Sequence, residues 1–366
     1  MHRGTRIALV AGGCATAVAA VGGVVALVAP DSTSSAAPSS SSEAAWRLVQ
    51  PANRAGKEVL SLASTPGGGM WSAAYDSSTY KMTVSRLTAK GWTPVSVPAS
   101  LTGTLPEGVS ATSASNVWVA GQKTDKSSGY HRALVWNGTT WKSHDLGAGY
   151  WPGGVVTTGP KSTWVFSATA DYARFWNGSS FKNQKIGVWP RAIGGTKSTD
   201  LWAVGHLKGV PSVAHWNGTS WKRTPVPAIP NLDTNGEAAS TFNSVVPVSS
   251  SNVWAAGTIY TKVGGKTVTK ALLGHWNGTA WKVAVGAAGT YYSDMASDGA
   301  GGIWISQGTT MRHRSKSGTW TKAALTVPAG VSRTYVSAMV NQAGSRTVWA
   351  AGGMLTGNKM QSAYWH

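Results

Sequence analysis

Hydrophobic and polar residues alternate along this chain in short runs, each of which ends in glycine, asparagine, serine or proline. Residues 133–136 and 271–276 are typical of these runs, in which valine, tryptophan and threonine recur. Alternation with a period of two predicts half-buried β-strands, and the frequent turn residues between the runs predict hairpins. The pattern therefore indicates an all-β fold.

One longer pattern repeats. An apolar-Trp-apolar-apolar-Gly segment is followed by Trp-Asn-Gly-Thr-x-Trp, with clear copies in residues 117–141, 201–221 and 253–281. The first tryptophan of each copy lies at position 71, 118, 164, 202, 254, 304 and 349. A spacing of roughly 40–50 residues is in the range of propeller blades, which are four-stranded sheets. Seven copies predict a seven-bladed β-propeller.

The last copy is incomplete. It reaches only a third strand, which ends at His366, while Trp46 begins an isolated fourth strand at the other end of the chain. An open ring of blades would leave its first and last faces uncovered, so the two ends are expected to complete one blade together. We therefore predict a propeller over residues 46–366, closed by its N- and C-terminal strands.

Four Asn-Gly-Thr/Ser segments begin at Asn137, Asn177, Asn217 and Asn277. Each matches a glycosylation acceptor, but each also lies between a predicted third and fourth strand. Asn-Gly is the preferred pair for a two-residue hairpin turn in which both central residues have positive φ. We interpret these segments as hairpin turns.

The N-terminal segment is expected to direct export. Arg3 and Arg6 precede an apolar run over residues 7–29, and small residues suit cleavage near Ala36. Residues 1–36 are therefore predicted to be an export signal and residues 37–45 a Ser/Ala/Pro linker. The alternative is that the apolar run remains as a membrane anchor, because it is long enough to span a bilayer. The protein is expected to be secreted or held at the cell surface.

Charge and cysteine content narrow the classes of partner and site. Only 12% of residues are charged, yet the net charge is +19. Such an excess attracts acidic partners, of which an anionic cell-wall polymer fits an exported protein, whereas nucleic acid is not expected. The alternative is that the lysines protect edge strands from aggregation. With Cys14 alone in the predicted signal, neither a disulfide framework nor a cysteine-ligated metal is expected.

The repeats resemble a known group of propellers. Residues 113–121 read Ser-Ala-Ser-Asn-Val-Trp-Val-Ala-Gly, and Trp-Asn-Gly-Thr-x-Trp follows. This repeat pattern is similar to that of the kelch-like and Asp-box propellers of exported bacterial proteins, photosystem-assembly-factor propellers among them. Residues 297–304 look like the blades of two-component sensors and streptogramin lyases. The resemblance covers residues 46–366 and implies the fold, but not one activity, because propellers host many functions.

No catalytic or cofactor motif is present in the sequence. Histidines and carboxylates do not cluster with metal-ligand spacing, and neither a phosphate-binding glycine loop nor a Gly-x-Ser-x-Gly elbow occurs. We therefore expect no metal, no cofactor and no dedicated catalytic residue.

Candidate binding residues lie at the predicted entry to each first strand. Aromatic residues at this point could form a collar on one rim, and charged residues two positions later could form a polar mouth to the channel. The competing interpretation of the collar is packing between blades. Two long segments, residues 225–242 and 259–270, are predicted as loops on the same rim, and long loops commonly carry function. The candidates are Trp151, Trp189, Arg191, Tyr292, Asp294, Tyr335, Glu107, Asp233 and Glu237.

These observations predict an exported, non-catalytic propeller that binds a saccharide or an anionic cell-envelope polymer at its loop-rich rim. Aromatic side chains can stack on sugar rings, and cations can pair with acidic groups. The first alternative is a polysaccharide hydrolase or lyase that uses Glu107, Asp233, Glu237 or Asp294 as acid and base. The second is a scaffold for protein–protein interaction. A membrane is expected as a partner only through an uncleaved N-terminal segment.

Overall fold

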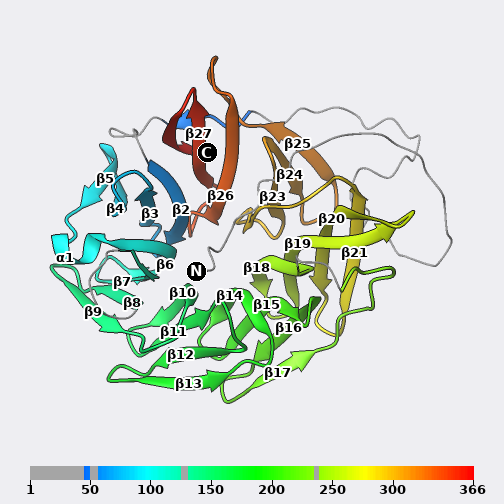
Figure 1. Ribbon diagram of the computed structural model, residues 1–366, viewed down its shortest axis with the longest axis horizontal. Helices are drawn as coiled ribbons and strands as arrows, with labels where there is room; N and C mark the ends of the chain where they lie inside the picture. The colour runs from blue at the N-terminus through cyan, green and yellow to red at the C-terminus, as the bar shows by residue number, and fades with distance from the viewer. Residues whose placement is uncertain (1–44, 50–56, 125–130, 235–238) are drawn as a thin grey trace.

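The computed structural model describes residues 45–49, 57–124, 131–234 and 239–366. The predicted export signal and nearly all of the predicted linker lie outside these residues, as does Glu237. The described chain forms seven four-stranded antiparallel sheets arranged as blades around a central axis (Figure 1). Within the described ranges, no helix is long and apolar enough to cross a membrane.

Blades one to six follow the chain from the innermost to the outermost strand, whereas the outermost strand of blade seven comes from the N-terminal segment. The only helix in these ranges, α1 (Ala99–Thr102), joins the first two blades. Blade one contains β2 (Lys57–Ser64), β3 (Met70–Asp76), β4 (Lys81–Thr88) and β5 (Gly91–Val95); blade two contains β6 (Thr104–Ser113), β7 (Asn116–Lys123), β8 (Arg132–Trp136) and β9 (Trp141–Asp145). Blade three contains β10 (Pro152–Gly159), β11 (Ser162–Ser167), β12 (Tyr172–Trp176) and β13 (Phe181–Lys185); blade four contains β14 (Trp189–Lys197), β15 (Asp200–Leu207), β16 (Val210–Trp216) and β17 (Trp221–Thr224). Blade five contains β18 (Thr241–Ser249), β19 (Asn252–Val263), β20 (Lys266–Trp276) and β21 (Trp281–Ala288); blade six contains β22 (Met295–Ser297), β23 (Ile303–Gln307), β24 (Thr310–Arg314) and β25 (Trp320–Ala324). Blade seven contains β26 (Arg333–Asn341), β27 (Val348–Thr356), β28 (Lys359–Trp365) and β1 (Leu48–Val49).

The hydrophobic core consists of seven layers, one between each pair of neighbouring blades. Every layer contains the second-strand tryptophan that marks the repeat; Trp118 and Trp202, for example, are almost fully buried. Because a flat antiparallel blade has an apolar face on both sides, each blade needs two neighbours to exclude water from it. The repeated tryptophans are therefore packing residues.

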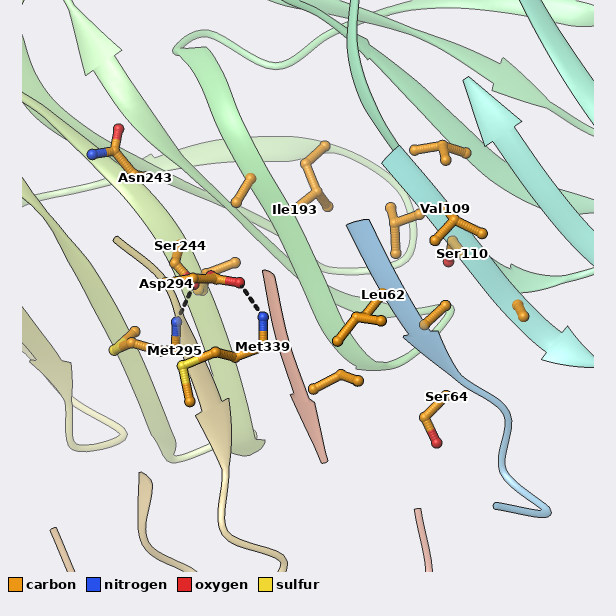
Figure 2. A pocket seen from close by; sticks show the side chains of 17 residues that line it. Leu62, Ser64, Val109, Ser110, Ile193, Asn243, Ser244, Asp294, Met295 and Met339 are labelled. Atoms are coloured by element: carbon orange, nitrogen blue, oxygen red, sulfur yellow. Dashed lines mark hydrogen bonds between the residues drawn. The ribbon is translucent and has the colours of Figure 1, made fainter. Parts of the chain in front are cut away.

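The innermost strands of all seven blades line a cavity of about 330 Å³ on the axis (Figure 2). Six of these strands contain a β-bulge near the end at which they begin; the bulged residues include Glu107, Arg191 and Ser337. A bulge inserts one unpaired residue and re-aims its side chain. The side chains of Glu107 and Arg191, predicted at the channel mouth, are therefore directed by a repeated irregularity of the strand.

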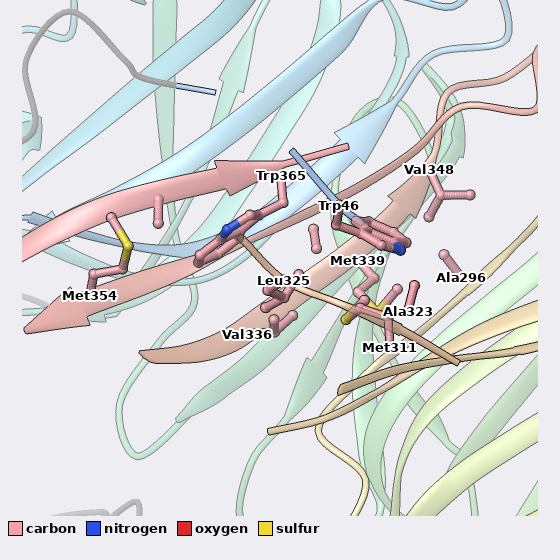
Figure 3. Close-up of a cluster of buried hydrophobic side chains, with 12 residues drawn as sticks. Trp46, Ala296, Met311, Ala323, Leu325, Val336, Met339, Val348, Met354 and Trp365 are labelled. Atoms are coloured by element: carbon pink, nitrogen blue, oxygen red, sulfur yellow. The ribbon is translucent and has the colours of Figure 1, made fainter. Parts of the chain in front are cut away.

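Closure by the two ends of the chain is confirmed. Strand β1 pairs with β28 through Leu48↔Trp365 and Val49↔Tyr364, so the N-terminal segment supplies the outermost strand of blade seven. Trp46 is 5% exposed, and its indole meets that of Trp304 edge to face at 5.2 Å. Figure 3 shows Trp46 and the fully buried Trp365 in one cluster with residues of blade six. The closing strand is thus held by packing as well as by backbone pairing.

The Asn-Gly segments form turns, but not the two-residue turns that were predicted. Trp136 pairs with Trp141, so four residues make the loop, and only Gly138 has positive φ. The Asn137 side-chain oxygen accepts hydrogen bonds from the backbone N–H groups of Thr139 and Thr140 at 3.0 and 2.8 Å. An asparagine that caps its own loop explains the repeated Asn without requiring positive φ at that residue.

A second repeated device joins the second and third strands close to these turns. His215 and His313 stack on the blade tryptophans Trp202 and Trp304 and contact the carboxylates of Asp200 and Asp298 at 2.7 and 2.9 Å. In blade five the equivalent His275 stacks on Trp254, but its partner at 2.9 Å is the amide oxygen of Asn252. Burial, together with the charges of Arg314 and Lys282, lowers the pKa of His275 to about 4.

Replacing this amide by a carboxylate should raise the pKa of His275. We expect Asn252→Asp to raise it by about 1–3 units, because a nearby opposite charge favours the protonated ring. In the wild type the folded ring stays neutral until pH falls to about 4, whereas an unfolded histidine takes up its proton near its ordinary value of 6.5. The wild type therefore loses stability as pH falls between these values, and the variant should lose less.

Histidine NMR titration measures the pKa directly, and His313, which already faces Asp298, is the internal reference. An unchanged His275 titration in Asn252→Asp would contradict this account of the stack.

Candidate functional site

The candidate site is the rim at which the innermost strands begin, together with the mouth of the central channel. Trp151 and Trp189 lie at this rim in neighbouring blades and are 42% and 41% exposed, among the most exposed large apolar side chains of the described residues. Each is followed by a buried proline, Pro152 or Pro190, at the start of the innermost strand. The residue before proline is held in extended conformation, and side chains alternate along a strand. The proline therefore packs inward while the indole is directed to solvent.

A histidine lies against each exposed indole. The ring centroids of His131 and Trp151 are 4.3 Å apart, and those of His206 and Trp189 are 5.5 Å apart. Burial lowers the pKa of both histidines, and the neighbouring cations Arg132 and Arg191 lower it further. Both rings are therefore neutral at physiological pH, and each supports one indole as a flat, exposed surface.

Arg191 and Glu107 face the same mouth of the channel. Water reaches the side chain of Arg191, but the surrounding strands remove part of its hydration, which lowers the pKa of the guanidinium. The negative charge of Glu107 acts in the opposite direction. Glu107 also accepts a hydrogen bond from the Gln122 side chain at 2.8 Å. The two charged residues come from blades four and two, and the bulged residue of the blade between them is Gly153, which has no side chain to separate them. The mouth thus combines a guanidinium with two exposed aromatic faces.

Two predicted collar residues lie elsewhere. Tyr292 is 4% exposed and packs in the layer between blades five and six, so its expected place on the exposed collar is corrected. The equivalent exposed residue is Tyr291, which is 46% exposed. In five other blades the rim residue stands 13 positions before the blade tryptophan, and this offset selects Tyr291 rather than Tyr292 in blade six. An error of one residue in register moves a side chain to the opposite face of the strand.

Tyr335 occupies the rim position of blade seven but is half-buried. Its hydroxyl donates a hydrogen bond to the carboxylate of Glu58, which holds the equivalent position in blade one. A side chain added at Gly353 would collide with the tyrosine ring, so this glycine provides the space for it. Tyr335 therefore belongs partly to the interface that closes the ring.

The carboxylate of Asp294 lies in the wall of the central cavity. Its Oδ2 accepts the backbone N–H of Met339, in the next blade, at 2.7 Å (Figure 2). Burial raises the pKa of Asp294 to about 6, although hydrogen bonds from Ser244, Met295 and Met339 act in the opposite direction. Asp294 is thus separated from the rim aromatics and faces the interior of the channel.

The two long rim segments differ from what was predicted. Residues 259–270 are not a loop, because β19 and β20 continue to Val263 and Lys266 and turn at Gly264 and Gly265. The β-branched residues of this segment favour the extended backbone, so β19 and β20 are longer than the corresponding strands of the other blades. Asp233, in the other segment, is 5% exposed and binds the extended hairpin through Lys262 at 3.0 Å and Thr267 at 2.7 Å. The structure therefore places Asp233 in a contact between the two segments and not on an open surface.

The nine candidates are thus only partly brought together. Trp151, Trp189, Arg191 and Glu107 share one side of the mouth, whereas Asp294 lies deeper and Tyr335 lies at the closing interface. Tyr292 and Asp233 are buried, and the ninth candidate, Glu237, lies outside the described residues. Among the described residues, no group of three or more His, Cys, Asp or Glu side chains is placed to hold a metal ion.

No protein-family model matches the sequence, and no curated protein matches it. Solved structures share the fold. The WD40 repeats of RRP9 superpose with a TM-score of 0.62 at 10% identity over 88% of this chain and 98% of that one. YCF48 bound to D1 peptide superposes with a TM-score of 0.57 at 13% identity over 88% and 97% of the two chains. The GH74 xyloglucanase from Xanthomonas campestris gives 0.56 at 13% identity over 87% of this chain and 53% of that one. At these identities the similarity establishes the propeller fold alone.

Proposed function

We propose that this chain is an exported, non-catalytic binding propeller, of the kelch-like or Asp-box-like kind, that holds an acidic saccharide polymer of the cell envelope at its loop-rich rim. The observation that carries the proposal is the pair of exposed indoles, Trp151 and Trp189, on neighbouring blades beside Arg191. Two flat apolar surfaces suit two successive sugar rings of an extended chain. A guanidinium beside them suits a carboxylate on one ring, and the net charge of +19 favours association with a polyanion.

The carboxylates support binding better than hydrolysis. Glycoside hydrolysis needs two carboxyl groups within about 5–10 Å of each other on either side of the bond. Glu107 and Asp294 come from blades two and six, which are not neighbours, and Asp233 is paired with Lys262 away from the channel. Glu237 lies outside the described residues. The three candidate carboxylates within the described residues therefore do not share one blade or one interface.

Removing the Trp189 side chain should weaken saccharide binding. We expect Trp189→Ala to reduce the affinity for an acidic oligosaccharide by about 1–3 kcal/mol, as for aromatic hot spots. Since the indole is 41% exposed, the melting temperature should hardly change. The measurement is calorimetric titration with uronic-acid and neutral oligosaccharides of equal length.

Trp189→Phe is the matched control, because it keeps a flat ring and should lose less affinity than the alanine variant. Arg191→Ala should weaken binding of the acidic chain more at low salt than at high salt, since an exposed ionic contact is screened. If Trp189→Ala lowers the melting temperature and leaves saccharide binding unchanged, the indole is a packing residue.

A protein partner is the second candidate function. The structure of YCF48 bound to D1 peptide has the same fold, and an acidic peptide could use the same indoles and guanidinium. The same titration with an acidic peptide separates the two, because tighter binding of the peptide than of the uronic-acid oligosaccharide would favour the scaffold function.

A further inference from the structure

The central cavity contains one charged group, and Ser110, Asn243 and Ser244 are among the uncharged polar residues that also line it. Seven equivalent positions, one from each innermost strand, contribute aliphatic or thioether side chains: Leu62, Val109, Val155, Ile193, Val245, Met295 and Met339. Of the described residues that line the cavity, Asp294 alone carries a charge. A volume of about 330 Å³ lies at the lower end of the range for small-ligand sites, which are mostly apolar with a few placed polar groups.

The contact between blades does not explain why this residue is an aspartate. Ser61 and Ser244 occupy the equivalent position in blades one and five. Their hydroxyls accept the N–H groups of Val109 and Met295 in the following blade at 3.0 and 3.3 Å. Asp294 accepts the N–H of Met339 in the same manner. Since a neutral hydroxyl makes this contact twice in the same ring, the negative charge of Asp294 is not required for it.

The Asp294 carboxylate retains capacity for a further donor. Its two oxygens offer about four acceptor positions, and hydrogen bonds from Ser244, Met295 and Met339 account for three of them. The side chain lies at the cavity wall between Met295 and Met339 (Figure 2). Methionine side chains are flexible and adapt to the shape of what they contact. A half-buried carboxylate with such neighbours is suited to a positively charged group that carries its own apolar body.

We propose that the central cavity binds a small organic ammonium ion, with the ammonium group against Asp294 and the apolar body against the ring of aliphatic and methionine side chains. An ammonium donates charge-assisted hydrogen bonds to the carboxylate. At the mouth of the channel, the negative charge of Glu107 and the positive charge of Arg191 offset each other.

The test uses n-butylammonium chloride and its neutral counterpart n-butanol, with potassium chloride at equal ionic strength as the salt control. Binding to the full chain is followed by the methyl NMR signals of Met295 and Met339. We expect n-butylammonium to shift both signals and to bind at least about tenfold more tightly than n-butanol, because the alcohol lacks the charge. Asp294→Ser, which copies Ser61 and Ser244, should remove this preference.

Asp145→Ser is the matched control, because Asp145 is an exposed carboxylate on β9, the outermost strand of blade two, whereas the innermost strands line the cavity. It should bind n-butylammonium as the wild type does. Should Asp294→Ser unfold, Asp294→Asn removes the charge with the least change in shape. Equal affinities for n-butylammonium and n-butanol, or an unchanged preference in the Asp294 variants, would show that Asp294 is only a contact between blades. This result is independent of the rim titrations, which use acidic saccharides.

Discussion

A chain that lacks Ser362–His366 should lose most of its stability. These residues form the end of β28, which pairs with both β27 and β1, so their removal also leaves β1 without its partner. Trp365 is fully buried, and its indole N–H donates to the Thr326 carbonyl at 2.9 Å. Loss of a buried tryptophan side chain alone typically costs about 3–5 kcal/mol, against a total stability of about 5–15 kcal/mol for a folded protein.

Thermal and denaturant unfolding measure this loss. A chain that begins at Ala45 is the control for truncation as such, because it keeps Trp46 and β1, and its melting temperature should match that of the full chain. Trp46→Ala should produce a smaller loss than the C-terminal deletion, since it leaves the pairing of β1 with β28 in place. A C-terminal deletion that melts at the wild-type temperature would show that the ring does not depend on its closing strand.

Asp294→Ser should make the protein more stable at pH 8. Burial raises the pKa of Asp294 to about 6 from its ordinary value of 3.8, so the ionised carboxylate is disfavoured in the folded state. A difference of two pKa units corresponds to about 3 kcal/mol between the protonation states. The serine removes this unfavourable charge and keeps the contact with the next blade, but it fills less volume than the aspartate. We therefore expect a net gain of about 1–3 kcal/mol in the free energy of unfolding.

The gain should disappear as the pH falls. The folded pKa is higher than the unfolded one, so the folded state holds the proton between pH 6 and about 4, where an unfolded carboxyl has lost it. The stabilising effect of protonated Asp294 is therefore complete below pH 4 and is lost as pH rises through 6. Urea unfolding at pH 8 and pH 4.5 checks this, with Asp145→Ser as the exposed control. A variant that is less stable than the wild type at pH 8 would mean that the ionised carboxylate stabilises the ring.

The stability of Asp294→Ser and the binding of n-butylammonium both test whether Asp294 serves a ligand in the central cavity. If the charged Asp294 destabilises the protein at neutral pH, then its presence in place of serine needs another explanation, and perturbed carboxylates in cavities are frequent at functional sites. Binding of n-butylammonium would supply that explanation. Stability measurements without ligand and binding measurements with it therefore test separate steps of the same account.

The architecture could be predicted from local patterns alone. The regular tryptophans, the alternation of apolar residues and the unfinished last repeat are all properties of neighbouring residues, and ring closure follows from the need to cover two apolar faces. Trp46 and Trp365 could be paired in this way although 319 positions separate them in the sequence. Repetition makes such a prediction possible because each blade repeats the same contacts with its neighbours.

The site depended on details that the pattern does not contain. Tyr291 and Tyr292 are adjacent and chemically alike; the offset from the blade tryptophan favours Tyr291, but the tertiary structure shows that Tyr291 is exposed and Tyr292 packs in the core. Whether Asp233 is open or paired depended on an extended hairpin that was predicted as a loop. The high pKa of Asp294 arises from burial on the axis, where strands from all seven blades meet. The sequence alone determined the blades, because their packing is local and repeated. Only the tertiary structure decided which polar groups face water, because these groups lie at the rim and in the central channel, to which all seven blades contribute.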